Sequence, residues 1–248
     1  MTRSVSSVIL AVSLAIAACG PGPDDAATDS APDQEAGSES AVSADRPDAT
    51  APDGENLSVP ASWSFRPDRP DRPHVVGSDS TADVFFVHMT PGWHVTTGPA
   101  GIFYHAGSIG SGAYRVESEF HLFDPGERRE AFGLFVGGSD LDGDAQAYLY
   151  FLVRQGGEFL VKERVGDSTN VLIEWAANDS INSYSEGSGS SVLNVLSVNV
   201  TADNVSFGVN GTEVASLAPD GLRTDGLIGF RVNHGLNLHI SSLDVMEH

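Results

Sequence analysis

The chain has 248 residues and carries 34 acidic residues against 13 Lys and Arg, which gives a formal net charge of −21. Such an acidic balance excludes binding to nucleic acids or to anionic lipid head groups through charge, and it favours a neutral or cationic partner. The single cysteine excludes an intrachain disulfide, so a folded domain must be held together by its core.

The first 18 residues are typical of a secretory signal. A short basic start precedes an apolar run over residues 5–18, which is too short to span a membrane and ends in small residues. The segment Ile-Ala-Ala-Cys at 16–19 resembles the lipobox of bacterial lipoproteins, which implies cleavage before Cys19 and lipidation at that residue. A plain signal peptide with a chance cysteine is the alternative.

The lipobox resemblance also predicts where the protein is found. It implies an exported protein that a lipid anchors to a bacterial membrane, without a transmembrane helix. Gly20 follows the cysteine at the position where an aspartate would retain a lipoprotein in the inner membrane. If the organism is Gram-negative, we therefore expect the outer membrane or the cell surface.

Residues 19–76 are predicted to be a disordered tether. Positions 20–58 hold ten acidic residues and a single base, Arg46, among Gly, Pro, Ala and Ser. This composition has too little apolar surface to offset the entropy of ordering, and its charges repel one another. The stretch RPDRPDRP at 66–73 shows no amphipathic pattern and is typical of an extended lead-in. We therefore expect the folded domain to cover residues 77–248.

Period-two alternation of apolar and polar residues recurs along that domain. The segments 113–123 and 158–165 alternate in this way and predict half-buried strands, whereas 147–154 is almost wholly apolar and predicts a strand covered on both sides. On 113–123 the apolar side chains are Tyr114, Val116, Phe120 and Leu122.

The C-terminal part is predicted to be a meander. Strands are expected at 194–200, 204–210, 212–217, 227–233 and 236–245, and the pair Asn210-Gly211 is a strong signal for a tight hairpin turn. No segment after residue 18 shows a sustained apolar stripe with helical period. The sequence therefore predicts an all-β domain with roughly a dozen short strands, of the kind that forms a two-sheet antiparallel sandwich.

Five segments carry a resemblance to a known superfamily. They are WHVTTGPAGIFYHAG, AYRVESEF, AYLYFLVRQGGEFLVKERVGD, NVLSVNVTADNVSFGVNGTEV and TDGLIGFRVNHGLNLHISSLDV. In this order they resemble the concanavalin A-like lectin/glucanase jelly roll, and within it the laminin-G-like and 3-keto-disaccharide-hydrolase-like branches. The resemblance covers about residues 83–246. It implies a jelly-roll fold, and it says much less about function.

The loop GGSDLDGDAQ at 137–146 is a weak candidate for a metal site. Asp140, Asp142 and Asp144 are spaced like the first ligands of an EF-hand loop, but Ala145 stands where that loop needs glycine and Phe151 where it needs a closing acid. Laminin-G-like domains often hold calcium at the rim of the sandwich, so a looser structural Ca²⁺ site stays open. The other reading is a solvated turn, and no other cofactor is expected.

Glu117 and Glu119 are candidate catalytic residues. They share one face of a strand, with Cα atoms about 7 Å apart, a separation at which paired carboxylates can act in glycoside hydrolysis. In laminarinase-like members of the fold a motif of the form E-x-D-x-E or E-x-D-x-x-E carries the nucleophile and the acid. Here the middle acid is Glu119, and the last acid is replaced by His121 or, one residue later, Leu122. The alternative is a solvated strand face with exposed ion pairs.

Sugar binding needs aromatic surfaces and a few polar side chains. The candidates for it are His94, Tyr104, Arg154, Arg164, Trp175, Asn233 and His234. The histidines are scattered along the sequence and show no zinc spacing.

Three functions stay open at this point. The leading hypothesis is a lipid-anchored envelope protein that binds a carbohydrate or an envelope glycan. The second is a glycoside hydrolase, either laminarinase-like or 3-keto-disaccharide-hydrolase-like, and the third is a structural or adhesive module with a protein partner.

Overall fold

The computed structural model describes residues 57–185 and 188–248. The predicted signal peptide, the predicted lipidation site Cys19 and most of the predicted tether lie outside these ranges. Within the ranges that are described, all regular structure is β, and no helix is long and apolar enough to cross a membrane.

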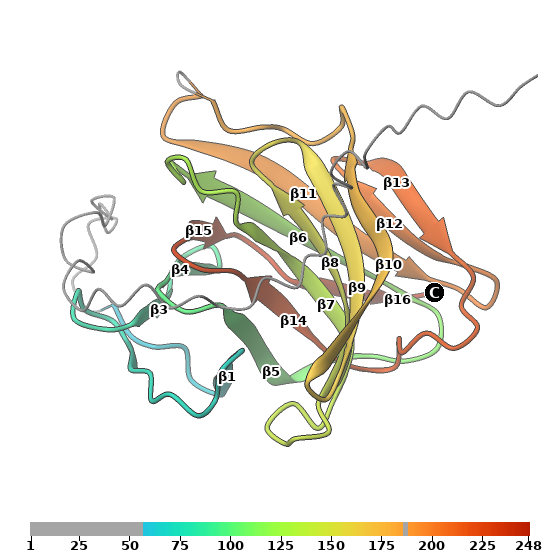
Figure 1. Cartoon of the computed structure of the whole chain (residues 1–248), viewed down its shortest axis with the longest axis horizontal. Helices are drawn as coiled ribbons and strands as arrows, with labels where there is room; N and C mark the ends of the chain where they lie inside the picture. Colours follow the sequence, from blue (N-terminus) through green and yellow to red (C-terminus); the bar gives the residue numbers. More distant parts are fainter. Residues whose placement is uncertain (1–56, 186–187) are drawn as a thin grey trace, which may run out of the picture. The chain divides into compact units, whose positions relative to one another are not determined.

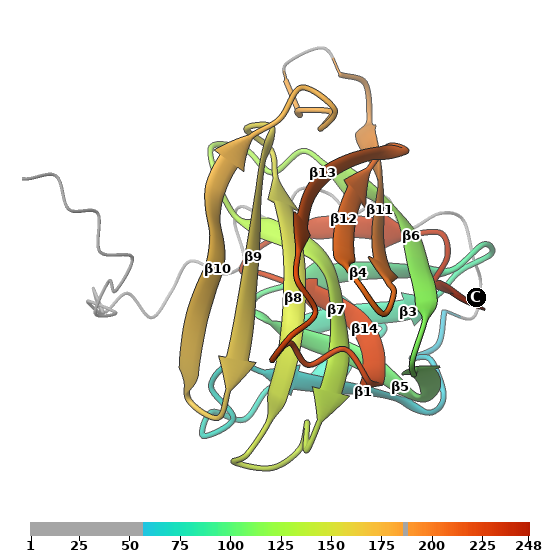
Figure 2. The same cartoon turned by 90° about the vertical axis from the view of Figure 1, so that its right-hand side faces the viewer.

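Two sheets face each other (Figure 1). The seven-stranded sheet has the order β1-β5-β14-β7-β8-β9-β10, which Figure 2 shows as one layer. The other sheet has nine strands, in the order β13-β12-β11-β6-β15-β4-β3-β2 with β16 also paired to β6. Every pairing is antiparallel except that of β2 with β3. The strands are β1 (Trp63–Pro67), β2 (Val76–Gly77), β3 (Val84–His88), β4 (Trp93–Thr97), β5 (Gly101–Gly110), β6 (Tyr114–Phe123), β7 (Ala131–Ser139), β8 (Ala147–Arg154), β9 (Glu158–Val165), β10 (Ser168–Ala177), β11 (Ser191–Val200), β12 (Val205–Val209), β13 (Thr212–Leu217), β14 (Gly226–Val232), β15 (Asn237–Ile240) and β16 (Asp244–Glu247).

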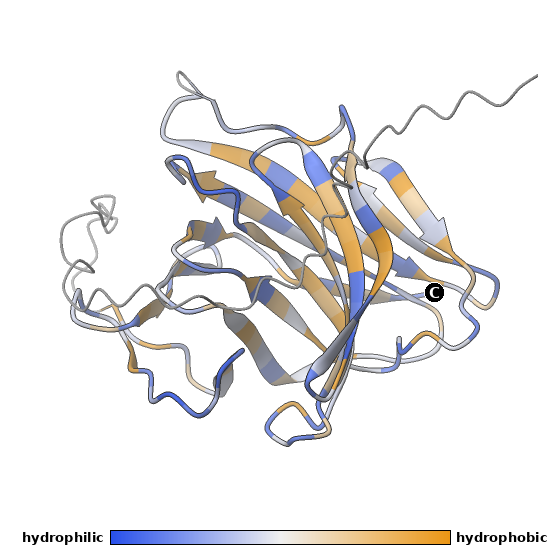
Figure 3. Cartoon of the chain, in the orientation of Figure 1, coloured by the Kyte–Doolittle hydropathy of each residue, from blue (hydrophilic) through white to orange (hydrophobic). Residues whose placement is uncertain are grey.

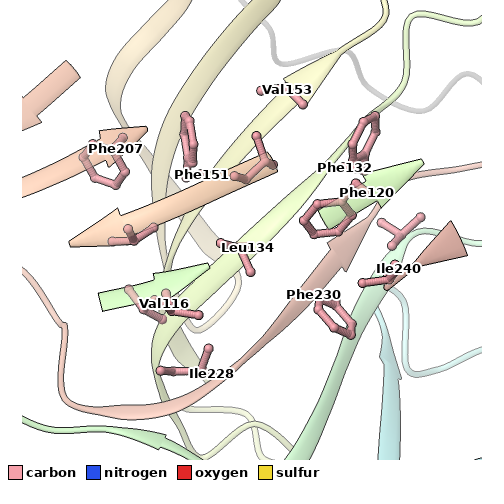
Figure 4. Close-up of a cluster of buried hydrophobic side chains, with 14 of the residues drawn as sticks. Val116, Phe120, Phe132, Leu134, Phe151, Val153, Phe207, Ile228, Phe230 and Ile240 are labelled. Carbon is pink, nitrogen blue, oxygen red and sulfur yellow. The ribbon is translucent and has the colours of Figure 1, made fainter. Parts of the chain in front are cut away.

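The core lies between the two sheets. On β6, buried and partly exposed residues alternate without a break, as the sequence predicts, because successive side chains of a strand point to opposite faces. Figure 3 shows that the strands carry most of the hydrophobic residues and that hydrophilic residues lie between them. The rings of Phe120, Phe132, Phe151, Phe207 and Phe230 fill the space between the layers (Figure 4).

Strand β8 is buried on both of its sides, as predicted. One set of its side chains joins the core between the sheets. The other set, Tyr148, Tyr150 and Leu152, belongs to a second apolar cluster that also contains Tyr104 and Leu141. The seven-stranded sheet therefore buries apolar surface on its outer side as well.

The predicted hairpin turn at Asn210-Gly211 is confirmed. It joins β12 and β13, and both residues have positive φ, 51° and 81°. Two successive residues with positive φ are what a type I′ turn requires, and asparagine and glycine tolerate that conformation best.

The structure differs from the sequence-based boundaries in three places. Strand β1 belongs to the seven-stranded sheet and Trp63 packs against the core, so the fold begins well before residue 77. The predicted strand 236–245 is two strands, β15 and β16, which both pair with β6. Strand β10 was not predicted, and it contains register shifts against β9.

Candidate functional site

The candidate site residues are divided between the outer faces of the two sheets. We call these the seven-strand face and the nine-strand face. Tyr104, Arg154, Arg164 and Trp175 belong to the seven-strand face. Glu117, Glu119 and His94 belong to the nine-strand face, because β6 and β4 are strands of the other sheet.

A buried ion pair lies at the centre of the seven-strand face. Both terminal nitrogens of Arg231 donate to the Asp68 carboxylate, at 2.7 and 2.6 Å, and one of them lies 3.3 Å from the Tyr148 hydroxyl. The guanidinium also lies 5.1 Å from the centre of the Tyr150 ring. Arg231 is 7% exposed, so its charge needs this bidentate partner.

The charges around Asp68 decide its protonation. Burial alone would raise the pKa of this carboxyl, but the guanidinium groups of Arg231 and Arg164 outweigh burial and lower the pKa to about 2. The nearest Arg164 nitrogen is 3.9 Å from the carboxylate. Burial raises the pKa of Tyr150 to about 12, so its hydroxyl stays protonated at neutral pH.

A second group of side chains forms the accessible rim of this face. The Arg154 guanidinium carbon lies 4.0 Å from the centre of the Trp175 ring, and its Nε donates to Glu158 at 2.8 Å. Arg129 donates to the same carboxylate oxygen at 2.6 Å. Trp175 is partly exposed, whereas Tyr148 and Tyr150 are almost fully buried.

The carboxylates of this face are held in the ionised form. Hydrogen bonds, first from Arg154 and then from Arg129, lower the pKa of Glu158. Asp68 is lowered as well. Glycoside hydrolysis needs a carboxylic acid with a raised pKa to protonate the leaving group. These two residues therefore have the electrostatics of binding groups.

The loop that carries Asp140, Asp142 and Asp144 is closed by its own hydrogen bonds. The Asp140 carboxylate accepts from the backbone N–H of Ala145 at 3.0 Å, and Asp142 accepts from the Tyr104 hydroxyl. Leu141 is buried among the apolar side chains of the seven-strand face. Among the described residues no group of three or more His, Cys, Asp or Glu has an arrangement that could hold a metal ion.

Leu141 also fixes where this loop lies. Its carbonyl accepts a hydrogen bond from Arg66 at 2.8 Å, which ties the loop to β1. Arg66 is 9% exposed. The loop is therefore a rim of the seven-strand face, held by one buried side chain and by polar contacts on either side.

Glu117 and Glu119 point outward from β6 on the opposite side of the sandwich. Glu117 forms an ion pair with Arg115, and both side chains are about one-third exposed. Neither glutamate shares a face with Arg154, Arg164 or Trp175.

Three histidines that are far apart in the sequence form a row on the nine-strand face. His239 pairs with His94 on one side and with His121 on the other, at ring-centre separations of 6.4 and 5.7 Å. Burial and then His239 lower the pKa of His94 to about 4. No sequence pattern indicates this row, because only the register of β4, β15 and β6 brings the rings together.

The remaining candidates are Tyr104, Asn233 and His234, and they differ in burial and in hydrogen bonding. Burial raises the pKa of Tyr104, whose hydroxyl donates to Asp142. The backbone of Asn233 is used structurally, since its carbonyl accepts from Thr97 Oγ1 at 2.6 Å. His234 is exposed and contributes to the lowered pKa of Asp68, which places it beside the seven-strand face.

Comparison with solved structures decides the fold. The chain is similar to carbohydrate binding module CBM66 of Bacillus subtilis, with a TM-score of 0.53 and 13% identity over 77% of this chain and 98% of that one. It is also similar to a protein with a galectin-like fold from the same organism, with a TM-score of 0.53 and 13% identity over 75% and 89% of the two chains. The fold is the concanavalin A-like jelly roll.

A glycoside hydrolase shares this jelly roll. A family 16 endo-glucanase of Bacteroides ovatus has a TM-score of 0.51 and 11% identity, over 75% of this chain and 94% of that one. At such identities the likeness concerns the fold alone. No family model matches the sequence, and no curated protein matches it either.

Proposed function

We propose that this jelly-roll domain binds a carbohydrate on its seven-strand face, without cleaving it. The observation that carries the proposal is the rim formed by Trp175, Arg154 and Glu158. An aromatic ring packs against the C–H face of a sugar, and fixed guanidinium and carboxylate groups hydrogen-bond its hydroxyls. Carbohydrate-binding proteins and glucanases among the solved structures of this fold support the proposal.

Binding is favoured over hydrolysis by the protonation of the two acids. Asp68 and Glu158 are both ion-paired, and both have a lowered pKa. Neither can supply the proton that a leaving sugar needs at neutral pH. Glu117 and Glu119 are on the other sheet, where the residues of the proposed binding face cannot position a substrate for them.

The membrane attachment is a further part of the proposal. Cys19, in its lipobox-like segment, would carry the lipid, and the acidic segment after it would separate the domain from the membrane. Membrane fractionation of cells that express the wild type and Cys19→Ser tests this part. We expect the variant to leave the membrane fraction, and retention there would contradict the anchor.

Affinity electrophoresis against a panel of polysaccharides, with and without Ca²⁺, tests sugar binding. The panel includes acidic as well as neutral glycans, because the seven-strand face has an excess of positive charge. Arg129 and Arg154 share the Glu158 carboxylate, and Arg164 and Arg231 share that of Asp68. We expect at least one glycan to retard the wild type, and Trp175→Ala to weaken its binding about 10-fold or more.

Val75→Ala is the control for Trp175→Ala. Val75 is an exposed apolar side chain just before β2, in the nine-stranded sheet, and it lines neither proposed site, so its loss should leave binding unchanged. A panel without a single hit, or a Trp175→Ala variant that binds like the wild type, would contradict the proposed site.

A further inference from the structure

A polar hollow opens on the nine-strand face, on the opposite side of the sandwich from Trp175 and Arg154. Its volume is about 220 Å³, and residues of β6, β11, β12 and β13 line it. None of its lining residues belongs to the seven-stranded sheet. It is therefore separate from the proposed carbohydrate face.

The hollow exists because a glycine stands in a row of larger residues. Cross-strand pairing places Glu117, Ser197, Gly208 and Glu213 in one row across four strands. A Cβ on Gly208 would lie 2.5 Å from the Ser197 hydroxyl oxygen, so any side chain there would enter the hollow. Beside it, a register shift between β12 and β13 leaves Val214 without a cross-strand partner, and such bulges often occur next to functional sites.

The walls of the hollow are hydrogen-bonding groups. A second row places Arg115, Asn199 and Ser206 beside the first, and Thr212 adds a hydroxyl at the turn. Ser197 and Ser206 are 5% and 9% exposed, and neither hydroxyl is among the buried polar atoms without a hydrogen-bond partner in the described residues, so both are open to the hollow. Water can satisfy these hydroxyls, and the hydroxyls of a polar ligand can replace that water.

Charge and size limit what can bind there. Arg115 is neutralised by its ion pair with Glu117, and Glu213 adds a negative charge at the edge, so the hollow does not favour an anion. Its polar walls do not favour an apolar ligand. At 220 Å³ it is smaller than the roughly 300 Å³ at which sites for drug-sized ligands begin.

We propose that this hollow is a second ligand site, which holds a single neutral sugar residue or a similar small polyol. Ser197, Ser206 and Thr212 offer hydroxyls to the ligand, and Gly208 leaves the space that the ring occupies. Asn199 offers its amide NH2, since its Oδ1 lies 2.8 Å from His248 Nε2. With the seven-strand face on the other side, the domain contacts glycans through both of its sheets.

Chemical-shift mapping with the ¹⁵N-labelled protein tests the second site. The probes are glucose, galactose, mannose, fructose, N-acetylglucosamine and glycerol, each titrated singly. A ligand this small binds in the millimolar range. We expect one or more probes to shift the amide signals of Ser197, Gly208 and Thr212 in a saturable way.

Two variants and one control make the result decisive. Gly208→Val fills the hollow and should weaken binding at least 10-fold, and Ser197→Ala, which removes only a hydroxyl, keeps the test valid if the valine disturbs folding. Ser216→Ala is the control, since Ser216 is an exposed serine paired with Ser206 on β13 that does not line the hollow.

The outcomes separate this site from the seven-strand face. Trp175→Ala should leave these shifts unchanged, because Trp175 is on the other sheet. A negative result for sugar binding at the seven-strand face would therefore not contradict the second site. If no probe produces saturable shifts at these amides, or if both Gly208→Val and Ser197→Ala bind like the wild type, the second site does not exist.

Discussion

The two outer faces of the sandwich use polar residues in opposite ways. On the seven-strand face the charged groups lie among almost fully buried tyrosines, and Arg231, Asp68, Arg154 and Glu158 are all paired. On the nine-strand face β6 alternates one buried with one partly exposed residue along its whole length.

The difference follows from how much water each face meets. Under burial an unpaired charge costs several kcal/mol, so arginines and acids on the seven-strand face must hold one another in place. On the part of the nine-strand face formed by β6, β11, β12 and β13, water can satisfy polar side chains, so a serine can stand without a protein partner and a glycine can leave a hollow. One face therefore presents a rigid charged surface, and the other an open one.

The largest expected effect comes from breaking the buried ion pair. Asp68→Ala leaves the guanidinium of Arg231 buried and unpaired, and we expect it to lower the free energy of unfolding by about 3–5 kcal/mol. Urea denaturation measures this change. The double variant Asp68→Leu with Arg231→Met removes both charges and should recover most of the loss. Equal stability of Asp68→Ala and the wild type would mean that the seven-strand face does not depend on this pair.

The second prediction concerns the pH dependence of the histidine row. The pKa of His94 is 6.5 in the unfolded chain and about 4 in the fold, so between these values the unfolded state binds a proton that the folded state does not. Stability is therefore fully present above pH 6.5 and is lost as the pH falls towards 4, by about 3 kcal/mol from His94.

Denaturation curves at a series of pH values measure this loss. His94→Gln, which cannot titrate, should flatten the curve between pH 6.5 and 4. The pKa of His239 is also lowered, by burial and by His121, so part of the slope should stay in the variant. An unchanged slope would show that His94 is protonated in the fold as readily as in the unfolded chain.

A smaller effect is expected in the loop at the rim of the seven-strand face. Asp140→Ala removes the acceptor of the Ala145 N–H and puts alanine at a φ of 49°, so we expect a loss of about 1–2 kcal/mol. Asp140→Asn keeps an acceptor and tolerates this φ, and it should cost less. Thermal melting with Ca²⁺ and with EDTA should give the same Tm, and a clear upward shift with Ca²⁺ would restore the metal-site reading.

The smallest effect is expected on the exposed ion pair of the nine-strand face. Glu117→Gln should change the free energy of unfolding by less than about 1 kcal/mol, because Arg115 and Glu117 are both about one-third exposed and water replaces the lost contact. Comparison with Asp68→Ala in the same urea titration sharpens the contrast between the faces. A loss as large as that of Asp68→Ala would mean that both faces are built on buried charge.

The sequence by itself determined much of the fold. Alternation on 113–123, the apolar run at 147–154 and the Asn210-Gly211 turn predicted β6, β8 and the hairpin between β12 and β13, because side-chain period and turn conformation are local properties. The order of such hairpins resembles the concanavalin A-like superfamily, and the jelly-roll fold that this resemblance implies is confirmed. The sequence also indicated that the aspartate loop is a weak calcium site, because Ala145 and Phe151 stand where an EF-hand loop needs glycine and an acid.

Only the tertiary structure decided which residues meet. It placed Glu117 and Trp175 on different sheets, brought Asp68 from the Pro-rich lead-in to Arg231, and aligned His94, His239 and His121 across three strands. It also put Gly208 beside Ser197, where a hollow results. These contacts depend on strand order and register, which are set by how the two sheets bury their apolar faces together, and a single strand carries no information about its neighbours.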